Sequence, residues 1–291
     1  MALPQFEYFA PQSLEELSRC LGEQAGRARI LAGGTDLVIL LRERLVRAEA
    51  LIDIGAIAAL RGIEPTPEGG LRIGAATRIR EVQRSALVRE RAFAMQQAAG
   101  DLGSTQIRDM ATLGGNSCNG SPAADTPPAL IALDATITLA SLRGRRQIPL
   151  EGFVTGARKT LIAPDEFLES FHLPAPWPNS ASRFAYAGLR DAMEIDIANC
   201  AVNVALEPVS RTIDRVRIVM GAVGPTQLRA RRAEDFLIGK LPQAQVLAEA
   251  AQLCADETDP IDDMRSSAAY RREVIKPLVR RTLADAVGAI A

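Results

Sequence analysis

The first predicted element is an amphipathic helix near the N-terminus. Its apolar residues recur at helical spacing: Leu14, Leu17 and Leu21. Ser13 can cap this helix, and Glu16 three residues later completes a capping box. Gly22 follows the last periodic residue, so we expect the helix to end there.

Between residues 28 and 135 the pattern changes several times. Short apolar runs predict strands at 28–32, 51–54 and 71–75. Apolar spacing or helix-forming composition predicts helices at 37–45, 79–87 and 91–100, with Thr77 as the cap of the second. Segment 103–128 holds many glycines, prolines and small polar residues without hydrophobic periodicity, which predicts a long loop. A loop of that length inside a compact domain is usually functional or disordered.

Residues 174–178 form the clearest domain boundary, because three prolines in five residues can continue neither a helix nor a central strand. Before the boundary we expect a hairpin of 136–142 with 147–150 and a strand at 166–173. Beyond it, strands are predicted at 182–186, 197–206 and 216–223, then helices at 231–238, 243–255 and from 267 onward, the last interrupted by Pro277. Strands followed by helices indicate the α+β class rather than a doubly wound fold.

Composition excludes several classes of protein. Apolar residues make up 47% of the 291 residues and charged residues 24%, which is the balance of a globular protein with a core of its own. The 34 basic and 35 acidic residues give a net charge of −1, so nucleic acid is not an expected partner. No secretory signal pattern and no membrane-spanning apolar stretch are visible, so the expected location is the cytoplasm.

Cysteine and histidine are too few and too scattered for a metal centre. The four cysteines form no CxxC pair and no disulfide framework is expected: Cys20, Cys118, Cys200 and Cys254. A single histidine, His172, cannot build a His-rich metal site and disfavours a hydrolytic triad. We therefore expect no metal ion in this chain.

Two Gly-Gly segments are candidate binding loops: Ala32-Gly33-Gly34-Thr35-Asp36 and Ala111-Thr112-Leu113-Gly114-Gly115-Asn116. Paired glycines let a backbone approach a ligand closely, and their N–H groups, with a threonine hydroxyl, can surround a pyrophosphate as an anion-binding nest. Each segment alone is also compatible with an ordinary turn. Together, each could hold part of one dinucleotide phosphate group. Neither contains the GxGxxG pattern, so a Rossmann site is not expected.

Asp125 is the third candidate. It lies in a proline-containing segment, Ser121-Pro122-Ala123-Ala124-Asp125-Thr126-Pro127-Pro128. A carboxylate held there can accept hydrogen bonds from ligand hydroxyls, such as those of a ribityl chain. A helix cap or a turn is the alternative role for an aspartate in this context.

These segments carry a resemblance to a known family. The stretches at 32–36, 106–116 and 121–135, with the tail DDMRSSAAYRREVIKPLVRR at 262–281, resemble the FAD subunits of the xanthine dehydrogenase and carbon monoxide dehydrogenase family. The likeness covers nearly the whole length. It implies a vanillyl-alcohol-oxidase-type (PCMH-type) FAD-binding domain over 1–175, built of two α+β subdomains at about 1–56 and 57–175. A C-terminal α+β domain would follow over 179–291.

The resemblance also implies contacts to FAD. The first pyrophosphate loop would comprise Ile30, Leu31, Ala32, Gly33, Gly34, Thr35, Asp36 and Leu37, and the second phosphate loop would include Thr112, Gly114, Gly115 and Asn116. Asp125 would be the flavin-binding aspartate, and Leu102 and Leu168 would be apolar residues beside the flavin. Some family members carry a lysine four residues before an arginine. Here Tyr186 takes that position, before Arg190. The missing charge should alter the flavin potential or the choice of electron acceptor.

The implied function is electron transfer inside a larger complex. A large subunit with the molybdenum cofactor would hydroxylate the substrate, and 2Fe–2S clusters of a small subunit would pass electrons to FAD in this chain. NAD or another acceptor would then receive them, in a complex expected to be a dimer of heterotrimers. Two alternatives remain open: a stand-alone FAD oxidoreductase of the same fold, and a non-catalytic scaffold whose glycine segments are simple turns.

Overall fold

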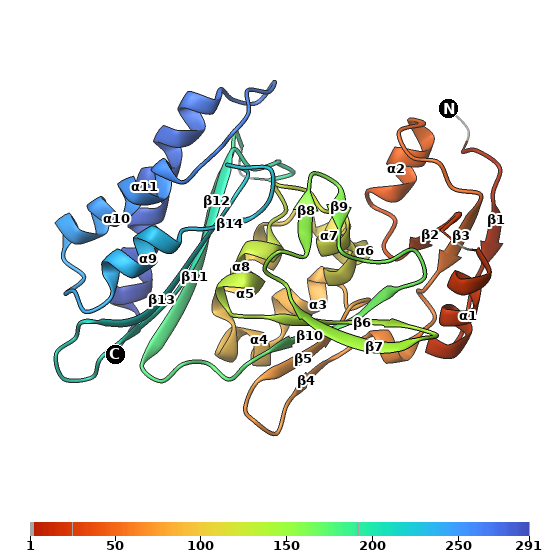
Figure 1. Cartoon of the computed structure of the whole chain (residues 1–291), viewed down its shortest axis with the longest axis horizontal. Coiled ribbons are helices and arrows are strands. Elements are labelled where there is room, and N and C mark those ends of the chain that lie inside the picture. The colour runs from red at the N-terminus through yellow and green to blue at the C-terminus, as the bar shows by residue number, and fades with distance from the viewer. Residues whose placement is uncertain (1–2, 25, 191, 291) are drawn as a thin grey trace.

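Three β-sheets of three or more strands, each accompanied by helices, make up the fold, which confirms the α+β class. The structure is a computed structural model and describes residues 3–24, 26–190 and 192–290. The N-terminal, middle and C-terminal regions follow one another along the long axis of the molecule (Figure 1). No helix in these residues is long and apolar enough to cross a membrane.

The N-terminal region is a parallel sheet of order β1-β3-β2 with one helix packed on it. Its elements are β1 (Glu7–Phe9), α1 (Leu14–Gln24), β2 (Ala28–Leu31), α2 (Leu37–Arg42) and β3 (Ala50–Asp53). Ser13 caps α1 as predicted, because its hydroxyl accepts a hydrogen bond from the backbone N–H of Glu16 at 3.1 Å. The predicted end at Gly22 is wrong: the helix continues to Gln24.

The middle region packs short helices against an antiparallel sheet of order β4-β5-β10-β6-β7. Its strands are β4 (Ile63–Pro65), β5 (Leu71–Gly74), β6 (Thr136–Ser141), β7 (Gly144–Pro149) and β10 (Phe167–Leu173), with a separate ribbon of β8 (Val154–Gly156) and β9 (Lys159–Thr160). Its helices are the 3-10 helix η1 (Ala58–Leu60), α3 (Ile79–Arg84), α4 (Ala86–Arg91), α5 (Phe93–Asp101), α6 (Thr105–Met110), α7 (Leu113–Cys118) and α8 (Thr126–Ala132).

The predicted loop over 103–128 is wrong, because this segment folds into α6, α7 and the start of α8. Two hydroxyls begin the first two of these helices. Ser104 accepts a hydrogen bond from Ile107 N–H at 3.2 Å, and Thr112 accepts one from Gly115 N–H at 3.1 Å. Six-residue helices are too short to show hydrophobic periodicity, so the caps were the only local signal.

The predicted helix over 79–87 is also wrong, since it is two helices that meet at Ser85. The Ser85 hydroxyl accepts a hydrogen bond from Val88 N–H at 3.3 Å and so begins α4. Thr77 caps neither helix. Its hydroxyl instead bonds the N–H and the carbonyl of Gly62, at 3.0 and 3.1 Å.

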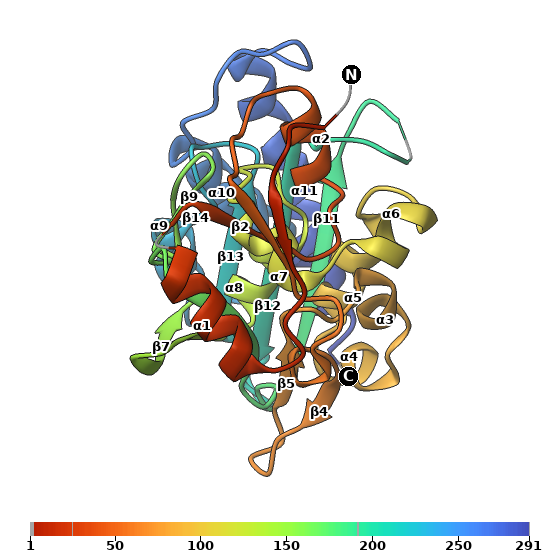
Figure 2. The ribbon, with the colours of Figure 1, turned by 90° about the vertical axis from the view of Figure 1, so that its right-hand side faces the viewer.

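The C-terminal region is an antiparallel sheet of order β11-β12-β13-β14 with helices on one face. Its elements are β11 (Ser180–Ala187), β12 (Ala198–Leu206), β13 (Ile213–Gly221), β14 (Leu228–Arg229), α9 (Arg231–Leu237), α10 (Ala244–Asp256) and α11 (Ala268–Gly288). The other face lies against α5 and α8, as Figure 2 shows from the N-terminal side. Strand β12 is therefore buried along its whole length. Pro277 does not interrupt α11, contrary to the prediction.

Polar contacts join the middle and C-terminal regions. Arg217 of β13 donates to Asp134 at 2.9 Å, and its guanidinium lies 5.3 Å from the centroid of the Trp177 ring. Arg229 of β14 pairs with Glu151 of the middle region at 3.2 Å. The two regions therefore meet through specific ion pairs as well as apolar packing.

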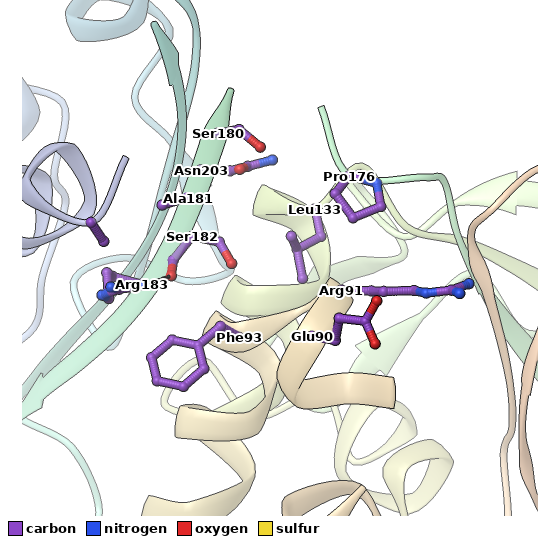
Figure 3. Close-up of a pocket in the computed structure, with 11 residues that line it drawn as sticks. Glu90, Arg91, Phe93, Leu133, Pro176, Ser180, Ala181, Ser182, Arg183 and Asn203 are labelled. Atoms are coloured by element: carbon purple, nitrogen blue, oxygen red, sulfur yellow. Dashed lines mark hydrogen bonds between the residues drawn. The ribbon is translucent and has the colours of Figure 1, made fainter. Parts of the chain in front are cut away.

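A cavity of about 210 Å³ opens where these two regions meet, between helices α4 and α5 and the edge strand β11 (Figure 3). Ser182 and Asn203 are paired residues of β11 and β12 and line it opposite Leu133. None of the residues predicted to bind a cofactor lines this cavity.

Candidate functional site

The turn after β2 carries a run of free backbone N–H groups. Within the described part of the chain, the amides of Gly33, Gly34, Thr35 and Asp36 donate no hydrogen bond. Gly34 has a φ of +73°, the left-handed conformation that favours glycine. Successive N–H groups around such a residue can converge on one anion. The turn thus has the donors that a phosphate group requires.

Gly33 allows two segments far apart in the sequence to touch. A Cβ at position 33 would lie 2.1 Å from the carbonyl oxygen of Met110 and 2.9 Å from the Cα of Ala111. Because these are backbone atoms, only glycine fits without moving the chain. The structure therefore brings the first Gly-Gly segment directly against the start of the second.

The second Gly-Gly segment begins helix α7, and its glycine amides are already used. Gly115 N–H donates to the Thr112 hydroxyl, and Gly114 N–H donates to the carbonyl of Ala75 at 2.8 Å. A Cβ on Gly114 would lie 2.8 Å from the Cβ and the carbonyl oxygen of Ala75. Both N–H groups therefore donate within the chain and Gly114 packs closely on Ala75, and contact of the two glycines with FAD stays a prediction.

Side chains of α7 provide donors in place of those amides. The Asn116 carbonyl oxygen accepts a hydrogen bond from the Thr126 hydroxyl at 2.6 Å, which leaves the Asn116 amide N–H groups to donate elsewhere. Ser117 is buried, and its hydroxyl has no partner among the described residues. A buried hydroxyl without a partner is the kind of group that a bound ligand satisfies.

Asp125 lies next to this cluster, at the start of α8. Its side chain makes no capping hydrogen bond to that helix, and the Asn116–Thr126 bond holds the helix start beside α7. Burial is the main cause that raises the pKa of the Asp125 carboxyl to about 7, and the charge of Asp101 adds to it. The three predicted segments therefore adjoin one another, with donors that suit phosphate and an acceptor that suits hydroxyl groups.

Family models match two successive parts of the chain. Residues 4–176 match the FAD binding domain in molybdopterin dehydrogenase, and residues 183–286 match the CO dehydrogenase flavoprotein C-terminal domain. The chain belongs to the family of FAD-binding subunits of molybdenum hydroxylases. It is therefore an oxidoreductase component, and its donor set fits the phosphate and hydroxyl groups of FAD.

Relatives of this FAD-binding subunit match over almost their full length. The xanthine dehydrogenase FAD-binding subunit of Escherichia coli O157:H7 is 33% identical over 266 residues, which cover 90% of each chain. The carbon monoxide dehydrogenase medium chain of Hydrogenophaga pseudoflava is 33% identical over 285 residues, which cover 97% of each chain. A solved structure of carbon monoxide dehydrogenase from Hydrogenophaga pseudoflava has a TM-score of 0.96 at 32% identity and covers all of both chains.

The two apolar residues predicted beside the flavin are core residues of this subunit. Leu102 follows α5 and Leu168 lies in β10, and both are buried in the cluster that contains Leu113 of α7. The pairing of β10 with β6 shifts between Leu168 and Ser170, so the strand is irregular at that point. Their contact with the flavin stays a prediction.

Tyr186 lies in β11 opposite Asn199 of β12 and packs against the same core. Arg190, four residues later, pairs with Glu194 at 3.3 Å and donates to the carbonyl of Met193 at 2.6 Å. A neutral aromatic residue therefore stands where some family members have lysine, and the charge of Arg190 is offset by Glu194.

The surroundings of Cys118 and His172 indicate roles in packing and hydrogen bonding within the fold. Burial raises the pKa of the Cys118 thiol to about 12, so it stays a neutral thiol. The His172 Nε2 atom lies 3.0 Å from the hydroxyls of Thr138 and Ser170 within the middle sheet. In the described ranges no group of three or more His, Cys, Asp or Glu side chains is placed to hold a metal ion.

Sequence reasoning missed the part that the C-terminal sheet plays at this site. Asn199 of β12, with Ala222 and Gln227 of the β13–β14 connection, donates hydrogen bonds to the segment before Asp125. These contacts join residues separated by 75 to 106 positions, so no local sequence motif predicts them.

Proposed function

We propose that this subunit holds FAD between its two glycine-containing segments and relays electrons within a molybdenum hydroxylase complex. The run of four free N–H groups at 33–36, packed against the start of the second segment, carries the proposal. Such a nest favours phosphate oxygens, and the pyrophosphate of FAD is the anion that family membership supplies.

The predicted residues take distinct roles in this proposal. The stretch from Ile30 to Leu37 surrounds the pyrophosphate, with Thr112, Asn116 and the unpartnered Ser117 adding side-chain donors. Asp125 accepts hydrogen bonds from ribityl hydroxyls. Two apolar residues, Leu102 and Leu168, offer surface to the isoalloxazine ring. Gly114 keeps α7 close to Ala75, and the Gly115 N–H donates to the Thr112 hydroxyl, so these two residues shape α7.

Bound FAD supplies reversible redox chemistry, and the residues of this chain bind and orient it. We propose that electrons come from 2Fe–2S clusters of a small partner subunit, after substrate oxidation at a large subunit with the molybdenum cofactor. They leave to NAD or another acceptor. Two relatives support this arrangement, because one is a subunit of xanthine dehydrogenase and the other is a chain of carbon monoxide dehydrogenase. The solved carbon monoxide dehydrogenase supports it too, because that enzyme is described as lacking the Mo-pyranopterin moiety of its molybdenum cofactor.

We also propose that the complex is a dimer of heterotrimers in the cytoplasm. For this chain we propose an FAD-binding domain over 1–175, with subdomains at about 1–56 and 57–175, and a C-terminal domain over 179–291. Purification of the native complex tests the assembly, because its subunits, mass and cofactors can be identified together. A lone chain that turns over substrate would instead favour a stand-alone FAD oxidoreductase. A colourless, folded chain that takes up no FAD would favour a scaffold.

FAD retention by glycine variants tests the binding site. The wild-type chain is expected to bind FAD stoichiometrically, as measured by flavin absorbance. Gly33→Asp and Gly115→Asp place a carboxylate against the phosphates, so both variants are expected to lose bound FAD. Gly115 is exposed, but an added Cβ there meets the Thr112 hydroxyl at 2.9 Å, so circular dichroism of the variant is measured as well to separate charge from misfolding. The matched control is Gly288→Asp, at a position where an added Cβ meets nothing within 4 Å. Unchanged flavin content in Gly33→Asp and Gly115→Asp contradicts the assignment.

A further inference from the structure

The segment before Asp125 is held from outside by the C-terminal region. Its backbone carbonyl oxygens accept hydrogen bonds from three donors that are distant in sequence. The bonds run from Gln227 Nε2 to Ser121 (2.9 Å) and Pro122 (3.4 Å), from Ala222 N–H to Pro122 (2.8 Å), and from Asn199 Nδ2 to Ala124 (3.5 Å). The backbone that presents Asp125 is thus fixed by the C-terminal sheet.

Asn199 is itself fixed by a buried carboxyl group. Its Nδ2 lies 2.6 Å from Oδ2 of Asp196, which is only 3% exposed. Its Oδ1 faces Gly221, where a Cβ would lie 2.3 Å away. The amide is therefore held between Asp196, the Ala124 carbonyl and a glycine that leaves room for it.

The titratable side chains that act on Asp196 are all acidic. Burial is the largest cause that raises the pKa of Asp196, to about 8; the charges of Asp125, Asp101 and Glu194 add to it, and the Asn199 hydrogen bond opposes it. Asp101 ends α5, Asp125 precedes α8 and Glu194 lies between β11 and β12, so these groups come from three different elements. Neighbouring buried carboxyls avoid carrying two charges, so the pair of Asp125 and Asp196 keeps a proton up to a higher pH than an exposed carboxyl does.

We propose that Asp196, Asn199 and Gln227 are positioning residues of the FAD site, through which the C-terminal region holds the Asp125 segment. This inference rests on the proposed function, because Asp125 is taken to accept hydrogen bonds from FAD. It makes the C-terminal domain part of cofactor retention, although all of the glycine segments lie outside that domain.

Gln227→Ala tests the positioning role in the full chain. Loss of one or two hydrogen bonds to the segment is expected to weaken FAD binding about 5- to 10-fold, measured by titration of the apo chain. The control is Gln245→Ala, because the Gln245 amide donates only to Glu249 on the exposed side of α10. Circular dichroism melting of both apo chains separates the two roles, because a merely structural residue would lower the melting temperature without a selective loss of FAD.

Asp196→Asn tests the role of the proton. The amide keeps a hydrogen-bonding group beside Asn199 but cannot ionise. In the wild type, FAD affinity is expected to fall as the pH rises through about 8, because Asp196 then ionises next to Asp125. In Asp196→Asn the fall above pH of about 8 is expected to be absent, because position 196 cannot ionise, and the affinity is expected to lie within about threefold of the wild type at pH of about 6.5.

The outcomes separate the inference from the function beneath it. If the wild-type chain binds no FAD, the proposed function fails and the inference fails with it. If the wild type binds FAD and Gly33→Asp does not, but Gln227→Ala binds like Gln245→Ala, only the positioning role is overturned. If Asp196→Asn shows the same pH profile as the wild type, the positioning role of Asp196 is overturned.

Discussion

Gly33 and Gly114 matter because of the side chains that they lack. Neither has a positive φ, so neither is needed for an unusual backbone conformation. Each is needed because a Cβ would meet the atoms of another segment, at Met110 and Ala75 respectively. Gly34, with a φ of +73°, is the residue of the first segment that depends on conformational freedom. Two adjacent glycines thus serve different physical purposes.

Arg271 is the buried cation on which the C-terminal region most depends. Its guanidinium donates to the carbonyls of Ile197 and Ala222 and to the Asp263 carboxylate. Arg271→Met leaves these acceptors unpaired, so urea unfolding is expected to show a loss of about 3 kcal/mol. Arg272→Met, at the exposed neighbouring position, should change the free energy of unfolding by less than about 0.5 kcal/mol. Equal effects of the two substitutions would refute this role.

Asp263 predicts an acid-sensitive contribution to stability. Burial alone would raise its pKa, but the backbone N–H of Arg265 and the Arg271 guanidinium outweigh burial and lower it to about 2. A depressed folded-state pKa stabilises the fold above the ordinary pKa of about 4, and this contribution is lost as the pH falls from about 4 to about 2. Acid titration of unfolding should therefore be flatter in Asp263→Asn than in the wild type over that window. Identical curves would exclude the effect.

Elements with a long apolar pattern could be predicted from the sequence, and elements held by caps could not. Strand β12 is apolar except for Asn199 and Asn203 because both of its faces are covered, and its limits were predicted to within one residue. Helices α6 and α7 have six residues each and depend on Ser104 and Thr112. The glycine pairs indicated the candidate site from the sequence, and its contact with FAD stays a prediction. That Gly114 and Gly115 already donate within the chain depends on Ala75 and Thr112, which no spacing rule indicates.

Helix α11 predicts a stabilising substitution. Pro277 lies inside the helix on its exposed side, where it removes one backbone hydrogen bond and crowds the preceding turn. Pro277→Ala restores the N–H donor, so the free energy of unfolding should rise by about 1 to 3 kcal/mol. Arg280→Ala, at another exposed position of the same helix, serves as the control with little change. A lower stability of Pro277→Ala would show that the proline shapes the helix against the sheet.

All three regions of the molecule contribute to the proposed FAD site. The N-terminal region supplies the first glycine segment, the middle region supplies α7 and Asp125, and the C-terminal region holds the backbone before Asp125. A ligand bound there contacts or tightens every region at once. Its binding energy should therefore stabilise the whole chain rather than one domain.

Thermal unfolding with and without FAD tests this coupling. At a free FAD concentration of about 100 times Kd, the free energy of unfolding should rise by about 2.7 kcal/mol. Because the regions are linked, circular dichroism and flavin release should report the same shifted transition. Gly33→Asp should show no shift. An FAD effect confined to the first of two separate transitions would mean that the C-terminal region unfolds independently of the site.

The contact between Trp177 and Arg217 gives the molecule a built-in optical probe. Trp177 is the only tryptophan in the sequence and lies in the connection between the middle and C-terminal regions. Its emission therefore comes from a single place, and no labelling is needed to watch that place alone. A red shift of the emission in mild denaturant, before helical signal is lost, would record the two regions parting while each is still folded.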